Sequence, residues 1–407
     1  MSSIRFFHTA DLHLDSPFKG MSELPEKGFE KLRNSTFEAF LTLIQKAIEE
    51  KPDFVLIVGD IYDGEERSLR AQKIFQSGME QLSEHQIPVI ISYGNHDHLK
   101  GKWTRFSLPE NVFVMPKETT RFVLNVRDIQ VNIYGFSYPE RHVPQAMIDT
   151  YPIATEQNAV HIGMLHGSLQ GNTTHDVYAP FTIDELLSKN YDYWALGHIH
   201  KRQVLHTDPP IIYPGNIQSR HRKEQGVKGF YGVTISNFAA DCTFIPTSAI
   251  VYEKIEVDCE NLIHANEVLR VCGQAIEDFR KQYGAGVVWL QLTNIDQKGM
   301  SLFEDSSIAE WLEVIREQEE ENTPFIWVQA LEIDKYTIDT YEPTLATESV
   351  IQVLNEWDPQ HLKEVVKDLY QHPKGSRYFE ELTNEELNHL VLEAKQLFKR
   401  YMSTNKG

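Results

Sequence analysis

The stretch VIISYGNHDH, residues 89–98, begins as an apolar run and ends in four polar side chains that can bind a metal ion. A short, continuous run of Val and Ile is typical of a strand that is buried on both faces. Asn95, His96, Asp97 and His98 follow at the point where this strand would leave its sheet. The same arrangement recurs along the first 248 residues, which indicates that the strand ends carry the function.

Short apolar runs alternate with helical patterns over these residues. Buried strands are predicted at 4–8 (IRFFH), 53–59 (DFVLIVG), 88–94 (PVIISYG), 131–136 (VNIYGF), 159–167 (AVHIGMLHG) and 193–200 (YWALGHIH). Between the first two, apolar residues from Phe37 to Ile48 recur with the period of a helix packed on a sheet. The strands after residue 202 follow one another without long helices, so antiparallel or mixed pairing is expected there. The fold class predicted for residues 1–248 is a layered α/β domain.

Side chains that bind metal ions follow several of these strands: Asp11, His13, Asp60, Asn95, His96, His166, His198 and His200. Each group alone has an ordinary explanation, because an Asp after a strand is usually a turn or cap residue and an HxH pair is usually incidental. In open α/β sheets, however, ligands lie beyond the carboxyl ends of the strands, so these distant groups could converge on one site. The ordered set therefore indicates a metal centre.

This ordered set resembles the signature of the calcineurin-like metallophosphoesterases. The segments HTADLHLDSPF (8–18), LIVGDIYD (56–63), GNHD (94–97), GHIH (197–200) and YPGN (213–216) are similar to SbcD-type DNA repair nucleases, in particular to YhaO-like DNA repair exonuclease-family proteins. The resemblance extends from residue 4 to about residue 247. It implies an αββα metallophosphoesterase sandwich over residues 1–248 and a phosphodiesterase that acts on DNA.

The resemblance also implies the ligands of two divalent metal ions. Asp11, His13, Asp60 and His200 would bind one ion, and Asp60, Asn95, His166 and His198 would bind the other, with Asp60 as the bridge. Two such ions can neutralise the phosphodiester, generate hydroxide and stabilise the leaving oxygen. Carboxylate, amide and imidazole ligands together suit manganese or iron better than calcium or structural zinc, so Mn²⁺ is the expected metal.

In the family pattern, the His of GNHD does not bind metal. His96 is therefore the predicted catalytic residue, which would donate to the scissile phosphate or protonate the leaving oxygen. The alternative is a histidine that only orients its neighbours. Asp97 is expected to fix the orientation of an imidazole. Some relatives have His three positions after the bridging Asp, whereas Asp63 stands there in this chain, so the role of that His cannot be transferred.

Basic residues near the ligand segments are predicted to contact the phosphates of DNA: Lys100, Lys102, Arg105, Arg220 and Arg222. The ordinary alternative is a surface of mixed charge. The formal charge of −20 argues on average against a polyanionic partner. Residues 249–407 hold 15 basic and 30 acidic side chains, however, which leaves a net charge of only −5 for the first 248 residues. A nucleic acid is therefore expected to bind the first part.

Two further segments follow the predicted phosphoesterase domain. Residues 249–342 are predicted to form a smaller α+β cap domain, and residues 343–407 a C-terminal helical segment. Thr383 and Glu386 form a capping-box pattern, followed by an apolar helix face from Leu387 to Tyr401. This face either packs on its own domain or docks a partner, and the resemblance implies an SMC-like coiled-coil ATPase. The sequence also leaves open whether the protein forms a homodimer.

The chain lacks an apolar run long enough for a membrane helix and a signal-peptide pattern, so a cytoplasmic protein with no membrane partner is expected. Its three cysteines are not spaced as zinc ligands and are expected to be reduced.

Two rival functions remain. A small-molecule phosphodiesterase or phosphatase would use the same metal site, and a non-catalytic assembly subunit could retain the scaffold.

Overall fold

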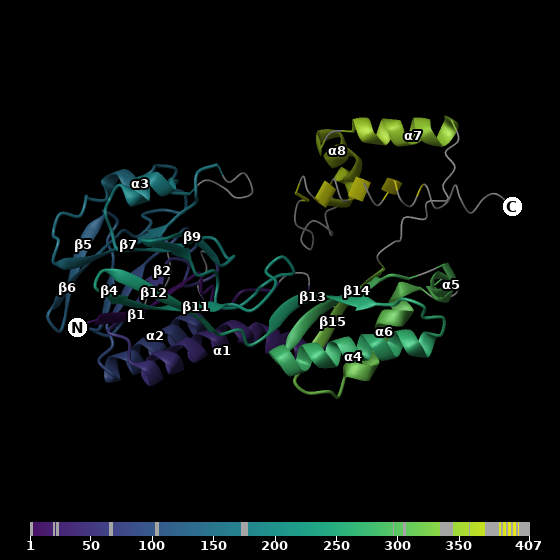
Figure 1. The fold of residues 1–407 in the computed structure, drawn as a ribbon, viewed down its shortest axis with the longest axis horizontal. Coiled ribbons are helices and arrows are strands. Elements are labelled where there is room, and N and C mark those ends of the chain that lie inside the picture. Colours follow the sequence, from purple (N-terminus) through teal and green to yellow (C-terminus); the bar gives the residue numbers. More distant parts are fainter. Residues whose placement is uncertain are drawn as a thin grey trace.

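A computed structural model of the 407-residue chain describes residues 3–18, 21, 24–64, 68–101, 106–171, 178–295, 297–303, 307–333, 345–357 and 359–370, with single residues and pairs between 382 and 398. The strands of these residues form two six-stranded sheets and one three-stranded sheet. Figure 1 shows the first two sheets stacked at one end of the molecule and the third sheet beside them.

The first sheet has the strand order β12-β11-β1-β2-β3-β4. Its strands are β1 (Ser3–Ala10), β2 (Phe54–Val58), β3 (Val89–Ser92), β4 (Val112–Val114), β11 (Gly229–Ser236) and β12 (Ala239–Pro246). β1 to β4 run parallel, whereas β11 is antiparallel to both β1 and β12. The parallel arrangement brings the carboxyl ends of β1, β2 and β3 to one edge, where three of the predicted ligand segments begin.

The second sheet has the order β5-β6-β7-β8-β10-β9. It consists of β5 (Thr120–Val126), β6 (Ile129–Gly135), β7 (Ala159–His166), β8 (Tyr193–Gly197), β9 (Gln203–Thr207) and β10 (Pro210–Tyr213). The four central strands are parallel, and β5 and β9 pair antiparallel at the two edges. The predicted buried strands are therefore confirmed, as is the mixed pairing after residue 202.

The two sheets form the middle layers of an αββα sandwich, as the family resemblance implies. The helices α1 (Glu26–Glu50) and α2 (Leu69–Glu84) cover the first sheet, where Phe40 and Phe75 stack with ring centroids 5.6 Å apart. A second apolar core lies between the sheets. On the outer face of the second sheet, buried Trp194 shares an apolar core with Ile148 of the 3-10 helix η1 (Met147–Thr150) and Leu186 of α3 (Ile183–Leu187). Figure 1 shows α3 on the side of the sandwich opposite α1 and α2.

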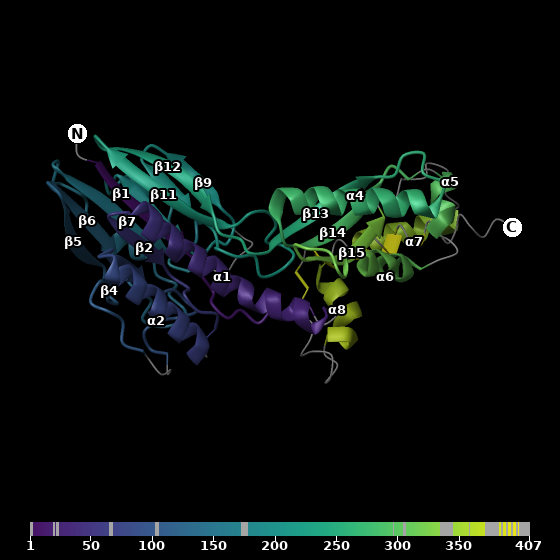
Figure 2. The same ribbon diagram turned by 90° about the horizontal axis from the view of Figure 1, so that it is seen from below.

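The third sheet consists of the parallel strands β13 (Val251–Asp258), β14 (Gly286–Thr293) and β15 (Ile326–Ile333). The helices α4 (Ala265–Tyr283) and α6 (Ile308–Glu319) pack on one face, and α5 (Gln297–Met300) and η2 (Ser301–Phe303) precede α6. On the other face, Tyr252 and Trp327 form a small core with Leu32 of α1. Figure 2 shows α1 extending from the sandwich toward this sheet. These elements fall within the predicted cap domain, whose boundaries stay a prediction.

Helices α7 (Leu345–Glu356) and α8 (Pro359–Tyr370) follow the third sheet. The capping box predicted at Thr383 and Glu386 is present, because the Thr383 Oγ1 accepts from the Glu386 backbone N–H at 3.3 Å and the Glu386 carboxylate accepts from the Thr383 N–H at 2.8 Å. Cys242, Cys259 and Cys272 are free thiols. Among the described residues, no helix is both long and apolar enough to cross a membrane.

Candidate metal centre

The seven predicted ligands all follow or end strands at one edge of the sandwich. Asp11 and His13 follow β1, Asp60 follows β2, and Asn95 follows β3, whereas His166 ends β7 and His198 and His200 follow β8. His198 and His200 are partly buried, and the other five are buried. The ends of the two sheets meet here, since a Cβ built on Gly197 at the end of β8 would lie 2.0 Å from the carbonyl oxygen of Val58 in β2.

Four of these ligands have a backbone conformation that L-residues rarely adopt. The φ angles are +51° at Asp11, +42° at His13, +50° at Asp60 and +98° at His198. Such residues cost on the order of 1–3 kcal/mol each and persist only where the surroundings fix them. The Asp11 N–H donates to Gly59 O at 3.2 Å and the His13 N–H to Asp60 O at 3.0 Å, so the first two ligand loops hold each other in these conformations.

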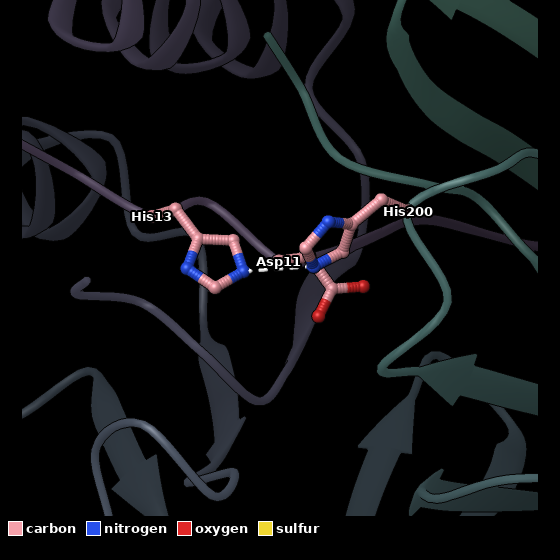
Figure 3. Close-up of side chains that lie close together, drawn as sticks. All are labelled: Asp11, His13 and His200. Carbon is pink, nitrogen blue, oxygen red and sulfur yellow. Dashed lines mark hydrogen bonds between the residues drawn. The ribbon is translucent and has the colours of Figure 1, made fainter. Parts of the chain in front are cut away.

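Asp11, His13 and His200 form the first cluster (Figure 3). They offer ligand atoms that all lie within 4.8 Å of one another. The two imidazole rings point toward each other, and their Nε2 atoms are 3.0 Å apart. Burial, together with the nearby Arg220 guanidinium, lowers the pKa of His13 to about 3 and also lowers the pKa of His200. Both imidazoles are therefore neutral near pH 7, which is the state that binds metal ions.

Asp60, His166 and His198 form the second cluster, again with ligand atoms within 4.8 Å of one another. Asn95 Oδ1 lies 3.0 Å and Asp60 Oδ2 lies 3.3 Å from His166 Nε2. Asp60 Oδ2 is also 3.9 Å from His13 Nε2 in the first cluster. The carboxylate of Asp60 thus lies between the two clusters, at the place that the predicted bridging ligand would occupy.

The charges of the site fit divalent cations. Burial raises the pKa of Asp11 to about 7, and the neighbouring Asp60 carboxylate acts in the same direction. Burial opposes a charged His166, but Asp60 and Asp11 outweigh it and raise the pKa of that imidazole to about 9. Two buried carboxylates so close together require compensating positive charge. Divalent cations bound by these side chains would supply that charge.

Two glycines next to the predicted ligands, Gly59 and Gly94, have no side chain and so leave room for the ligand side chains of the clusters. A Cβ on Gly59 would lie 2.1 Å from His166 Nδ1, and a Cβ on Gly94 would lie 2.3 Å from Asp60 Oδ1 and 2.8 Å from His166 Nε2. The GD and GN pairs of the sequence therefore have a steric reason, because a larger residue would displace the Asp60 carboxylate or the His166 imidazole.

His96 lies at the open side of the clusters, with 31% of its side chain exposed. Its backbone N–H donates to Asp60 Oδ1 at 2.9 Å, and its Nδ1 accepts from the Gly64 N–H at 3.3 Å. The two carboxylate oxygens of Asp97 accept from the backbone N–H groups of Ile61 at 2.8 Å and Gly94 at 2.7 Å, so Asp97 fixes the backbone around the Asp60 carboxylate. A role of Asp97 in orienting an imidazole stays a prediction.

Asp63 stands where some relatives have a histidine, and in this protein its carboxylate lies among Ser16, His13 and His96. It accepts a hydrogen bond from Ser16 Oγ at 2.8 Å and lies 3.7 Å from His13 Nδ1 and 3.6 Å from His96 Nδ1. Arg220 Nη1 lies 3.3 Å away and balances its charge. Asp63 therefore lies beside the first cluster with an arginine as its counterion.

The predicted DNA contacts are not all brought to the site. Arg220 is there, with Nη2 3.1 Å from His200 Nδ1 and 13% of its side chain exposed. Lys100 is exposed and pairs with Glu140 at 3.0 Å, and Arg222 lies 3.6 Å from Glu386 of the C-terminal segment. Lys102 and Arg105 lie outside the described residues.

Sequence reasoning missed Glu224, a buried carboxylate that accepts from His200 Nδ1 at 2.7 Å. It stands in the polar run SRHRKEQ (219–225), where neither periodicity nor spacing separates it from a solvated residue. It also missed Tyr178, whose ring lies 5.1 Å from that of His198 between centroids.

A layered αββα fold with two adjacent clusters of Asp and His at the strand ends is consistent with a metallophosphoesterase. The sequence of residues 4–202 matches the calcineurin-like phosphoesterase family. Over 99% of its length, the chain is 36% identical to the uncharacterized metallophosphoesterase YhaO of Bacillus subtilis, of which it covers 98%. The chain belongs to the calcineurin-like metallophosphoesterase family, and it is a metal-dependent hydrolase.

A second relative is more distant. The chain is 26% identical to the DNA double-strand break repair protein Mre11 of Methanocaldococcus jannaschii, over 64% of this chain and 69% of that protein. Among solved structures, GAP50, the anchor in the inner membrane complex of Plasmodium, aligns with a TM-score of 0.39 and 15% identity over 61% of this chain and 86% of that chain.

The substitution Gly94→Ala should disrupt the centre without removing a ligand, because the added Cβ collides with both Asp60 and His166. Overpacking of this kind costs about 1–3 kcal/mol. We expect a lower melting temperature and a large loss of hydrolysis of bis-p-nitrophenyl phosphate. The control is Gly273→Ala in α4, where an added Cβ meets no atom within 4 Å. Unchanged activity of Gly94→Ala would show that the site tolerates the displacement.

Proposed function

We propose that this protein hydrolyses phosphodiester bonds of DNA with two divalent metal ions, of which Mn²⁺ fits the donor set best. The observation that carries the proposal is the position of Asp60, 3.3 Å from His166 Nε2 in one cluster and 3.9 Å from His13 Nε2 in the other. The similarity to Mre11, a DNA double-strand break repair protein by its description, supports DNA as the substrate.

The protein's own residues would bind the ions as the motifs imply. Asp11, His13, Asp60 and His200 would hold one, and Asp60, Asn95, His166 and His198 the other. When bound, such a pair of ions neutralises the phosphodiester and supplies hydroxide near neutral pH. Asp11, His13, Asp60, Asn95 and His166 are buried, whereas His96 has 31% of its side chain exposed, where a substrate could reach it.

His96 has the exposure and the hydrogen-bond partners for a catalytic acid. Its Nδ1 accepts from the Gly64 N–H, so the neutral ring carries its proton on Nε2. The Nε2–H can donate to a phosphate oxygen, and the ring in its protonated form can deliver a proton to the leaving sugar oxygen. Asp63 Oδ1, 3.6 Å from Nδ1, would stabilise the protonated ring. These contacts support a catalytic role rather than a purely orienting one.

One observation favours the rival small-molecule phosphodiesterase. Lys100 and Arg222, which were expected to contact DNA, lie within ion-pairing distance of Glu140 and Glu386. The deciding experiment compares hydrolysis of labelled single- and double-stranded DNA with that of bis-p-nitrophenyl phosphate, each with and without Mn²⁺. Turnover of the small ester alone would refute the DNA proposal. The rival non-catalytic subunit predicts no turnover of either substrate, and the complete ligand set argues against it.

The bridging position of Asp60 predicts that Asp60→Ala loses both metal ions, because each cluster loses a ligand and the compensating charge. The matched control is Asp11→Ala, which removes a carboxylate from the first cluster only and should lose about one ion. Elemental analysis of the purified variants measures both. Retention of two ions at wild-type occupancy by Asp60→Ala would rule out the bridge.

The substitution His96→Ala should leave metal and substrate binding intact and slow turnover. Loss of a general acid typically costs on the order of 10²–10⁴ in rate. The control is His85→Ala, an exposed histidine whose ring bonds the carbonyl of Gln81 at the end of α2. Single-turnover rates at saturating Mn²⁺ decide the matter, and an unchanged rate with full metal occupancy would reduce His96 to an orienting residue.

We further propose that the C-terminal apolar face docks an SMC-like coiled-coil ATPase. Leu390 is 40% exposed, whereas Leu387 is buried at 1%, and Leu397 lies outside the described residues. Leu390→Asp should abolish co-purification with such an ATPase and leave the melting temperature unchanged. Leu387→Asp is the contrast, because a charge buried there should lower the melting temperature. A large drop in melting temperature for Leu390→Asp would show that the face packs on its own chain.

A further inference from the structure

Glu224 lies in the loop between β10 and β11, and only 6% of its side chain is exposed. A buried carboxylate is costly unless its oxygens accept hydrogen bonds. Oε1 lies 2.7 Å from His200 Nδ1, and Oε2 accepts from Asn216 Nδ2 at 2.8 Å and from the Arg220 backbone N–H at 2.7 Å. One oxygen therefore holds the imidazole of a predicted metal ligand, and the other is fixed to the loop.

The two ring nitrogens of His200 have different neighbours. Nδ1 lies against Glu224, whereas Nε2 is 3.0 Å from His13 Nε2 in the first cluster. A neutral imidazole carries one proton, so a proton on Nδ1 leaves the Nε2 lone pair directed into the cluster. The contact with Glu224 therefore selects the tautomer that can bind a metal ion through Nε2.

Arg220 is a competitor for the same nitrogen, because its Nη2 lies 3.1 Å from His200 Nδ1. A guanidinium can only donate, so a bond from Arg220 would require the opposite tautomer. The Glu224 contact is shorter and is charge-assisted. Arg220 also has the carboxylate of Asp63 at 3.3 Å to balance its charge. These distances favour donation from Nδ1 to Glu224.

The same loop holds the backbone of His200. Lys228 Nζ donates to the His200 carbonyl at 3.2 Å, and the Asn216 N–H donates to it at 3.3 Å. Gly215 must be small here, since a Cβ would lie 2.7 Å from that oxygen. The loop therefore fixes both the backbone carbonyl and the imidazole ring of His200, and Glu224 is the loop residue whose carboxylate contacts the ring.

The second cluster is built differently. The Nδ1 of His166 lies 3.1 Å from the backbone carbonyl of Val58. A carbonyl also fixes the tautomer, but it carries no net charge, whereas a carboxylate raises the basicity of the imidazole that it accepts from. Side-chain substitution can therefore alter the orienting partner of His200 and cannot alter that of His166.

We propose that Glu224 is a positioning residue that holds the His200 imidazole for metal binding, and that it sets the affinity of the first cluster independently of the second. The proposal rests on the ligand assignment of the proposed function. Loss of an outer partner of this kind typically weakens metal binding about 10- to 100-fold.

The first test needs no metal. In the metal-free protein, ¹⁵N NMR of the imidazoles distinguishes a proton on Nδ1 from one on Nε2, and a His200→Asn variant identifies the His200 signals. The wild type should show His200 protonated on Nδ1, and Glu224→Gln should shift the ring toward the Nε2 tautomer. A His200 already protonated on Nε2 in the wild type would assign the ring to Arg220 and overturn the proposal.

The second test is titration of the wild type and variants with Mn²⁺ by calorimetry. Glu224→Gln should weaken one of two sites about 10- to 100-fold and leave the other unchanged. Glu224→Asp, which keeps the carboxylate, should recover part of the loss. The control is Glu185→Gln, the same chemical change in the capping box of α3, and it should match the wild type.

The outcomes distinguish the proposed binding of two metal ions from the proposed positioning role of Glu224. A wild type that binds fewer than two ions contradicts the proposed function, while the NMR result still reports on Glu224. Two sites of unchanged affinity in Glu224→Gln overturn the positioning role alone. Equal weakening of both sites, or a melting temperature far below that of Glu185→Gln, would mean that Glu224 only supports the loop.

Discussion

The buried carboxylate of Asp60 is the group around which the centre is built. It accepts from the His96 backbone N–H at 2.9 Å and lies 3.3 Å from His166 and 3.9 Å from His13. Burial alone would raise its pKa, but these partners, His166 first, hold the pKa well below its usual value. The negative charge of this buried carboxylate must be neutralised by its surroundings. The adjoining loops therefore supply imidazoles and other side chains that can bind cations.

The geometry of those loops follows from this constraint. To turn their side chains inward at the strand ends, Asp11, His13 and Asp60 adopt positive φ angles, and the loops after β1 and β2 bond to each other. Asp97 ties the loop after β2 to the loop after β3 through backbone N–H groups. Strain of this kind persists only in a rigid scaffold, which the two sheets and their intervening core provide.

The ligand loops are also linked to the third sheet. Phe18, in the segment that follows the first two ligands, packs with Tyr252 and Trp289 in a small core. Buried Gln218, in the loop that carries Glu224, donates to Ile250 O at 2.7 Å and accepts from the Ala249 N–H at 2.9 Å. Loops on two sides of the first cluster therefore have contacts at the start of β13. The physical consequence is that the third sheet and the first cluster share supporting residues.

The sequence by itself determined a layered α/β domain, because buried strands and their helices have periodicities that depend only on local order. The family resemblance added that its layers form an αββα sandwich. The sequence also determined the residue types at the strand ends, and the resemblance ordered them into two clusters. Only the tertiary structure decided that Glu224 orients His200, that Asp97 bonds to backbone N–H groups, and that Arg220 lies beside Asp63. It also decided that Lys100 pairs with Glu140 on the surface. These are contacts between side chains and groups distant in sequence, and a local pattern cannot specify which buried charge meets which partner, since that depends on how the loops pack.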